Sequence, residues 1–226
     1  MMKLTIFAAS GGIGRHLLEQ AVAAGHDVTA VVRSPQSLTG WEGRARVVTA
    51  DLAAPASDVL ASAVVGRDAV LSGLGPRKPR SEAGVTSQGT KAIVAAMQAT
   101  GVKRLVVVSA APIGTVPSPG RPNPPKHDAG DGFFMRHLGS RFARAMFSAH
   151  YADLALMEDT LRASDLDWTV SRPPQLTDKP LTGVYRTAHG QNLVGGSKVS
   201  RADVAHHMLR VVDQPETIKQ TIGIAN

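Results

Sequence analysis

The stretch that decides the fold is AASGGIGRHLLEQ, residues Ala8–Gln20. It follows the apolar segment KLTIF and leads into a segment whose apolar residues recur at helical spacing. Gly11 and Gly14 take the second and third positions of a G-x-x-G-x-x-G spacing, and Ala8, also a small residue, takes the first. A glycine turn that enters a helix exposes backbone N–H groups that bind phosphate. The turn therefore predicts a dinucleotide site rather than an ordinary strand–helix junction, with these residues as ligands: Ser10, Gly11, Gly12, Ile13 and Gly14.

Short apolar segments alternate with longer helix-like segments in the first half of the chain. Strands are predicted over residues 3–10, 27–33, 45–51, 68–75 and 103–111, and helices over 14–25, 57–65 and 84–101. The last of these strands is nearly continuous in apolar residues, as is typical of a sheet covered on both faces. The alternation predicts an α/β protein, namely a doubly wound parallel sheet of the Rossmann type with a small irregular C-terminal substrate lobe.

The regular alternation stops after Ser109. Residues 111–132 are rich in proline and glycine, which excludes a central strand or the interior of a helix. Long irregular loops in compact domains are commonly functional, so we expect residues 110–150 to form a lid or substrate-pocket insertion. The remaining expectations are a helix over 133–163, a strand over 167–174 and a contribution of residues 171–200 to the pocket, then a helix over 200–213 with Ser200 as its N-cap and a strand over 217–225. We expect one NAD(P)-binding domain, 1–226.

The composition restricts the classes of partner. The formal net charge is +7 and the pI about 10.1, which favours anionic partners. The basic residues are scattered and only 4% of residues are aromatic, so we expect no nucleic-acid partner. A transmembrane helix needs about 18 consecutive apolar residues, and no apolar run in the sequence is that long, so we expect no membrane contact. The chain has no cysteine, which favours a cytoplasmic location, and its histidines lack second ligands in register, so no metal site is expected. The sequence does not determine the oligomeric state.

The end of the second predicted strand indicates the cofactor. Arg33 follows Gly14 by about 20 positions, where an acidic residue would bind the ribose diol of NAD and an arginine would pair with the 2′-phosphate of NADP. Ser34 adds a hydroxyl group at the same place. These two residues favour NADP(H), with NAD(H) possible. The alternative for Arg33 is an ordinary surface arginine.

Several segments, taken in order, resemble a known family. AASGGIGRHLLEQAVAAGHDVTAVVRSP, VVTADL, AVLSGLG, GVKRLVVVSA and LRASDLDWTVSRPPQLTDKPLTGVYR are similar to the NAD(P)H-binding atypical short-chain dehydrogenases, above all the NmrA-like group and the biliverdin reductase B and flavin reductase type. The resemblance covers nearly the whole chain. It implies these cofactor contacts: Asp51 and Leu52 beside the adenine, Gly73, Leu74 and Gly75 over the pyrophosphate and ribose, Ser109 facing the nicotinamide, and Pro173 flanking it.

The chain departs from short-chain dehydrogenases at the Tyr-x-x-x-Lys pair, in which a lysine lowers the pKa of the tyrosine that transfers a proton. Four positions after Tyr151 stands Ala155. If the helix is aligned instead by Glu158, the tyrosine position falls on His150 and the lysine position on Leu154. The lysine is missing in both alignments, which argues against an alcohol dehydrogenase or epimerase mechanism.

Hydride transfer to a flavin, a quinone or a similar aromatic acceptor does not need that pair, because these acceptors need chiefly to be stacked in a dry pocket. We therefore expect an NAD(P)H-dependent oxidoreductase with a small aromatic substrate, and the catalytic candidates are Ser109, Tyr151 and His127. Two alternatives are a tailoring oxygenase or reductase acting on an aromatic polyketide quinone and a non-enzymatic NmrA-type NAD(P)-sensing regulator. Residues that could line the acceptor site are Phe133, Phe134, Met135, Phe142, Met146 and Phe147.

Overall fold

The computed structural model describes the backbone of residues 1–76, 84–131 and 140–226, and the side chains of the same residues except 140–147. Within this part of the chain, the main sheet has eight strands in the order β3-β2-β1-β4-β5-β6-β10-β8. Neighbouring strands are parallel except β8, which is antiparallel to β10. The strands are β1 (Lys3–Phe7), β2 (Asp27–Val32), β3 (Arg46–Thr49), β4 (Ala69–Ser72), β5 (Arg104–Val108), β6 (Asp167–Arg172), β8 (Arg186–His189) and β10 (Gln220–Ala225).

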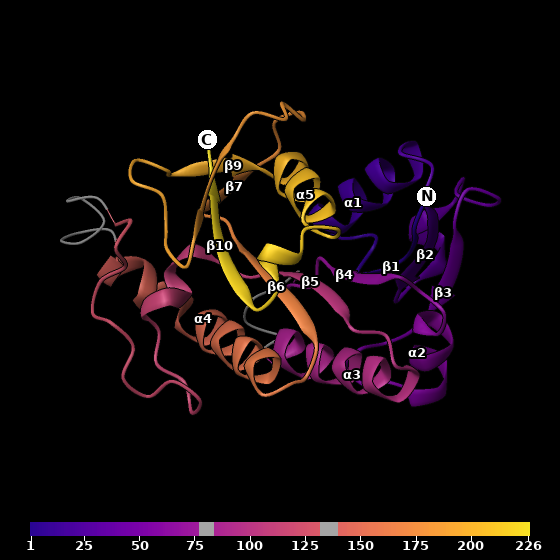
Figure 1. The fold of residues 1–226 in the computed structure, drawn as a ribbon, viewed down its shortest axis with the longest axis horizontal. Helices are drawn as coiled ribbons and strands as arrows, with labels where there is room; N and C mark the ends of the chain where they lie inside the picture. Colours follow the sequence, from indigo (N-terminus) through magenta and orange to yellow (C-terminus); the bar gives the residue numbers. More distant parts are fainter. Residues whose placement is uncertain (77–83, 132–139) are drawn as a thin grey trace.

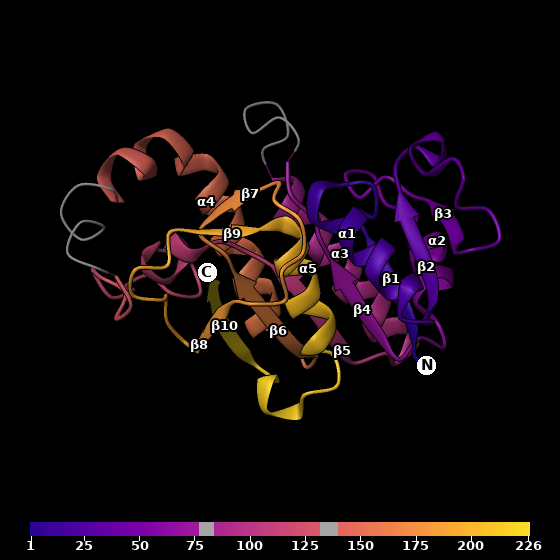
Figure 2. The same cartoon turned by 90° about the horizontal axis from the view of Figure 1, so that it is seen from above.

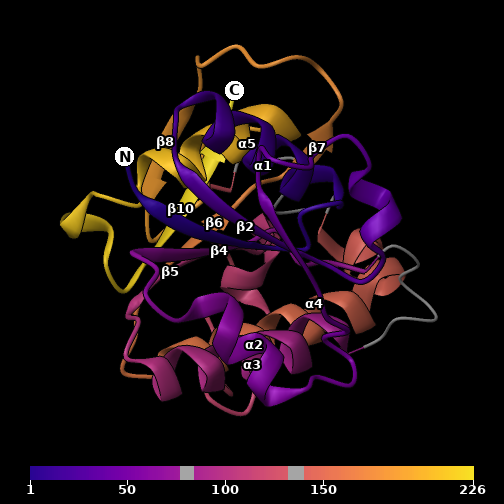
Figure 3. The same ribbon diagram turned by 90° about the vertical axis from the view of Figure 1, so that its right-hand side faces the viewer.

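Helices cover both faces of this sheet. One face carries α1 and α5, and the other carries α2, α3 and α4, as Figure 3 shows with the sheet seen between the two layers. On the second face, α3 packs against α4, and the N–H groups of Thr86 and Ser87 at the start of α3 donate to the carboxylate of Asp153 of α4; Figure 1 shows both helices along the lower edge of the molecule. The helices are α1 (Gly12–Ala23), α2 (Ser57–Val64), α3 (Val85–Thr100), α4 (Ser140–Arg162) and α5 (Arg201–Arg210), and the short 3-10 helices are η1 (Pro35–Leu38), η2 (Ala111–Thr115) and η4 (Pro215–Thr217). This two-sided covering explains why β4 is buried along its whole length.

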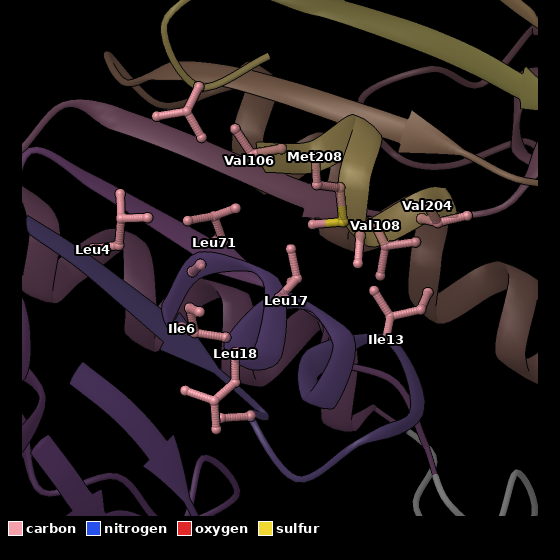
Figure 4. Close-up of a cluster of buried hydrophobic side chains, with 14 of the residues drawn as sticks. Leu4, Ile6, Ile13, Leu17, Leu18, Leu71, Val106, Val108, Val204 and Met208 are labelled. Carbon is pink, nitrogen blue, oxygen red and sulfur yellow. The ribbon is translucent and has the colours of Figure 1, made fainter. Parts of the chain in front are cut away.

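Each face of the sheet has its own apolar core. In β1, Leu4 and Ile6 point toward α1 and α5, whereas Phe7 points toward α2 and α3, because successive side chains alternate across a strand. Figure 4 shows the first core, in which Leu17 of α1 and Met208 of α5 pack over the strands. The two cores hold the carboxyl ends of the strands in place, and the candidate site lies there.

The doubly wound parallel sheet predicted from the sequence is confirmed. The predicted strand and helix boundaries agree within a few residues, and local signals explain two of them. α3 ends at Thr100 because Gly101 takes a left-handed conformation with φ 77°. α5 begins after Ser200, whose side chain accepts a hydrogen bond from the backbone N–H of Asp203, as its predicted role as N-cap requires. Of the helix predicted over 133–163, the described part begins at Ser140 and ends at Arg162.

The segment between β6 and α5 contains strands that the sequence pattern did not indicate. β7 (Gln175–Thr177) and β9 (Lys198–Ser200) form a parallel pair of their own, and β8 joins the edge of the main sheet. These strands have three or four residues, and no residue of β7 or β8 is fully buried, so no apolar alternation marks them. Figure 2 shows β7 and β9 close to α5 and above the main sheet.

Within residues 1–76, 84–131 and 140–226, no helix combines the length and the apolar character needed to cross a membrane.

Candidate functional site

A cavity of about 640 Å³ lies at the carboxyl edge of the sheet. Residues that follow β1, β2, β3, β4 and β5 line it, so it lies where the strand order reverses between β1 and β4. Ligands of open parallel sheets bind at this switch point. Most residues predicted to bind the cofactor line the cavity: Ser10, Gly11, Gly12, Ile13, Arg33, Asp51, Leu52, Gly73, Leu74, Gly75 and Ser109.

The turn between β1 and α1 is held by close backbone contacts. The N–H of Gly11 donates to the carbonyl of Ala8 at 2.8 Å. A Cβ on Gly14 would lie 2.1 Å from the same carbonyl oxygen, and a Cβ on Gly73 would lie 2.9 Å from the amide nitrogen of Gly14. Gly14 does not line the cavity itself but lets α1 begin directly against the exits of β1 and β4. Gly11 occupies the N-cap, and in the described part of the chain no side chain caps it, so the first N–H groups of α1 face the cavity.

Ala8 has a backbone conformation that glycine adopts more easily. Its φ is 55°, in the left-handed region. From the spacing alone, this first position requires only a small residue. The structure adds a conformational reason for the glycine that many such turns have there, and Ala8 adopts the same conformation at a cost of about 1–2 kcal/mol.

An arginine from α5 lies beside the start of α1. The Arg201 Nε is 2.8 Å from the position that a Cβ on Gly12 would take, and Arg201 lines the cavity. Its Nη1 donates to Oδ1 of Asp178 at 2.6 Å. Asp178 is 88% exposed, so this ion pair is weak. A guanidinium group and a helix N-terminus therefore meet at one point, which suits a bound phosphate.

The end of the cavity beside β2 and β3 carries Arg33, Asp51 and Leu52. Leu52 is buried, and Oδ1 of Asp51 accepts a hydrogen bond from the N–H of Ala53 at 3.0 Å. Ser34, predicted to act with Arg33, is not among the lining residues; its hydroxyl bonds to the side chain of Gln36 at 2.6 Å. At this end the structure thus brings together three of the four predicted residues.

The opposite end of the cavity carries Ser109, which is held by a buried ionic network. The Ser109 hydroxyl donates to Oε1 of Glu158 at 2.8 Å. Glu158 is 1% exposed and also accepts hydrogen bonds from Arg172, through Nε at 2.9 Å, and from Arg162 at 2.6 Å. The hydroxyl proton of Ser109 therefore points to Glu158, and its oxygen keeps the capacity to accept a hydrogen bond from a ligand.

One face of α4 lines the same end of the cavity. His150 and Leu154, one turn apart, are lining residues, and Glu158 of the next turn bonds Ser109. Nδ1 of His150 is buried and has no hydrogen-bond partner among the described residues. Burial lowers the pKa of His150, against a smaller opposite effect of Asp153, so the imidazole is neutral at pH 7.

Three predicted site residues lie elsewhere. Tyr151 is not a lining residue; it packs against the core beneath α2 and α3, and burial raises its pKa. His127 lines a second cavity. Pro173 is outside the lining, and its carbonyl accepts a hydrogen bond from the N–H of Ala111 at 2.9 Å. Of the expected aromatic wall, Phe133, Phe134 and Met135 lie outside the described residues, as do the side chains of Phe142, Met146 and Phe147.

The lining residues that no sequence pattern indicated include Val85, Leu176, Asp178 and Arg201. Leu176 and Asp178 belong to the segment 171–200 that was expected to contribute to the pocket. No sequence pattern indicated that Arg201 belongs to the site. It follows α1 by some 180 positions in the chain, and only the packing of α5 on α1 brings it to Gly12.

Comparisons with known proteins agree with this geometry. A family model described as NAD(P)H-binding matches residues 8–215. The UPF0659 protein C216.03 of Schizosaccharomyces pombe is 29% identical over 91% of this chain and 83% of that protein. A Burkholderia pseudomallei protein, which carries the word exported in its name, is 29% identical with a TM-score of 0.71 over the whole of both chains.

A third protein shares the fold. ChuY of Escherichia coli O157:H7, named an anaerobillin reductase, is 24% identical with a TM-score of 0.76 over 99% of this chain and 96% of that chain. The family model covers the glycine turn, every strand end that lines the cavity, and α5. The chain therefore belongs to the NAD(P)H-binding family, as its resemblance to the NmrA-like atypical short-chain dehydrogenases implies.

Proposed function

We propose that this protein is an NADPH-dependent reductase whose hydride acceptor is a flat conjugated molecule such as a flavin or a quinone. One observation carries the proposal: the α4 face that lines the cavity presents His150 and Leu154. These are the tyrosine and lysine positions of short-chain dehydrogenases when α4 is aligned by Glu158. The cavity thus holds a neutral imidazole and an alkyl group where carbonyl reduction would need a phenol activated by an ammonium group.

The residues present fit a dinucleotide along the whole cavity. Glycines at positions 11, 12 and 73 leave backbone surface at the turn, and the uncapped start of α1 supplies N–H groups for phosphate. Arg201 would add a cation for the pyrophosphate. Leu52 would pack on the adenine, and Asp51 would bind at the adenosine end.

The chain's own groups at the β5 end can orient a nicotinamide but offer little acid catalysis. A bound reduced nicotinamide supplies a hydride. The Ser109 oxygen, whose proton points to Glu158, would accept a hydrogen bond from a carboxamide N–H. His150 is neutral at pH 7 and can hydrogen-bond an acceptor oxygen, but it brings no extra proton. Leu154 and Val108 keep this end apolar and restrict water.

This arrangement favours acceptors whose reduced form takes its proton from water. Quinones and flavins meet that requirement, since hydride addition gives a delocalised anion. A simple ketone would give an alkoxide, which needs a positioned acid. ChuY, named a reductase, shares the fold, and this likeness is consistent with the proposal.

The proposal is tested by following NADPH absorbance with FMN, riboflavin and menadione, and in parallel with a panel of simple ketones. Steady oxidation with a flavin or quinone and none with ketones is the expected result. Turnover with ketones alone, or no turnover with any flavin or quinone, would overturn it. Cofactor binding without consumption would favour a sensing role, and oxygen uptake in stoichiometry with quinone product would favour the oxygen-dependent tailoring reaction.

The preference for NADPH rests on Arg33 at the adenosine end of the cavity. A charge-assisted hydrogen bond to the 2′-phosphate contributes about 1.5–3 kcal/mol, so Arg33→Asp should raise the Kd for NADPH by about tenfold or more. The Kd for NADH should change by less than about threefold. Arg46→Asp is the matched control, because Arg46 is exposed at the start of β3, away from the cavity. Equal weakening of both cofactors by Arg33→Asp would refute the assignment.

A further inference from the structure

A second cavity, of about 600 Å³, lies behind the ionic network of Ser109 and Glu158. It is bordered by the end of α4, by the loop that follows η2, and by β6 and β10, two strands that Figure 1 shows side by side. Among the described residues it shares no lining residue with the first cavity. The lining of the first cavity has the features of a dinucleotide site, whereas the described lining of the second has more cations than anions.

Among the residues that the structure describes, the cationic side chains in the lining of the second cavity are Arg121, Arg162, Arg172 and Lys219. Arg172 is 5% exposed and pairs with Glu158 through Nε and Nη2, which leaves Nη1 for another partner. Arg162 pairs with Glu158 and Asp159. The carboxylates of Glu158 and Asp159 are thus already paired with these two arginines.

The other two cations have no such partners. Within the part of the chain that the structure describes, the side chains of Arg121 and Lys219 make no hydrogen bond or ion pair. Burial lowers the pKa of Arg121, the charges of Arg172 and Arg162 lower it further, and the carboxylates of Glu158 and Asp128 offset part of this effect. The guanidinium groups therefore repel one another across the cavity, and an anion between them would relieve this repulsion.

Asp128 is the carboxylate in the described lining, and one of its oxygens is held by donors outside the group of cations. Oδ1 of Asp128 accepts hydrogen bonds from the N–H groups of Gly130 and Asn192, at 3.0 and 2.7 Å. Gly114 allows both side chains to approach its backbone closely: a Cβ there would lie 2.7 Å from Oδ2 of Asp128 and 3.3 Å from Nη1 of Arg172. Nη1 of Arg172 and Oδ2 of Asp128 therefore both lie close to Gly114, at the wall of the cavity.

Backbone strain marks the same cavity. Lys219 has φ 57°, in the region that favours glycine, while its N–H donates to the carbonyl of Trp168 at 2.6 Å. Strained residues cluster where a ligand is clamped. A lysine held in this conformation at the wall of a cationic cavity is consistent with a role for its ammonium group.

We propose that the second cavity is a binding site for a small organic oxyanion, with carboxylate or phosphate oxygens bound by Arg121, Arg172 and Lys219 and with the indole of Trp168 as its apolar wall. Guanidinium groups bind both kinds of oxyanion in a bidentate manner, so the chemistry is shared and the source is an outcome of the test. The proposal does not depend on the acceptor proposed for the first cavity.

The test is calorimetric titration of the whole chain with inorganic phosphate, citrate and benzoate at constant ionic strength, with and without saturating NADPH. Saturable binding of at least one probe, at one site and unchanged by NADPH, is expected. Arg121→Gln should weaken it about tenfold or more, and Lys219→Gly should weaken it while relieving the backbone strain. Arg46→Gln, on an exposed strand end, should leave it unchanged.

Each outcome of the titration either supports or overturns the proposed oxyanion site. Binding of phosphate alone, or of the carboxylates alone, supports the site and identifies the headgroup. Absence of saturable binding with all three probes overturns the proposal. Competition with NADPH, or binding that survives Arg121→Gln unchanged, also overturns it, because the anion would then occupy the first cavity or the general basic surface. The Lys219→Gly variant keeps the test valid if one arginine variant folds poorly.

Discussion

Replacing Gly14 by alanine tests whether tight backbone contact at the start of α1 forms the cofactor site. The new Cβ would lie 2.1 Å from the carbonyl oxygen of Ala8, 2.8 Å from its carbonyl carbon and 3.1 Å from Cα of Ala9. All three are backbone atoms, so no side chain can rotate aside. Ordinary contact begins at 3.4 Å, which means that α1 and the turn must separate by about 1.3 Å.

The expected magnitude follows from two opposing effects. Overpacking costs about 1–3 kcal/mol, and the upper part of that range applies because only backbone can yield. Alanine gains about 1 kcal/mol over glycine in helix propensity. The net loss in the free energy of unfolding is therefore about 2 kcal/mol, which lowers the Tm of a chain of this length by about 4–8 °C. The displaced N–H groups lose phosphate contacts, so the Kd for NADPH should rise about tenfold or more.

Thermal unfolding and NADPH titration of Gly14→Ala measure both effects. Gly75→Ala is the control for stability, because a Cβ on Gly75 meets no atom of the described residues within 4 Å and its φ is not in the left-handed region. Its Tm should stay equal or rise slightly, since alanine restricts the unfolded chain. A Gly14→Ala protein that melts with the parent and binds NADPH equally well would show that this contact neither limits packing nor forms the site.

Three further predictions concern single residues. Ala8→Gly should raise the free energy of unfolding by about 0.5–1 kcal/mol in denaturant titration, since the φ of 55° favours glycine and the entropy of the unfolded chain offsets part of the gain. Arg201→Ala should weaken NADPH binding about tenfold, whereas Asp178→Ala, which frees Arg201, should not weaken it. Burial lowers the pKa of His207 to about 4, so stability should fall as the pH drops from 6.5 toward 4, and His207→Gln, unlike His16→Gln, should flatten this dependence.

The parts of the fold that the sequence predicted well are those with local causes. Gly101 ends α3 and Ser200 begins α5 through bonds within a few residues, and the apolar strands are long enough to show their pattern. β7 and β8 escaped prediction because they have three or four residues and little buried apolar surface. Their position depends on partners distant in the chain, which periodicity does not report.

Some residues of the candidate site could likewise be predicted from the sequence, and others could not. The turn, Arg33, Asp51 and Gly73 could be named in advance, because in a parallel sheet the residues after each strand meet at one edge. The helix α4 could not be oriented from its sequence, since Tyr151 and His150 are adjacent and a rotation of one residue exchanges them. Only its packing on the sheet decides that His150 faces the cavity.

By itself, the sequence determined the doubly wound order of strands and helices and the glycine turn that would receive a dinucleotide, because these depend on spacing along the chain. Only the tertiary structure decided that Ala8 is strained, that Arg201 stands beside Gly12, and that the proton of Ser109 points to buried Glu158. It alone also revealed the cationic second cavity. These features arise from contacts between residues far apart in sequence, and their geometry is set by how the helices pack on the sheet rather than by any local pattern.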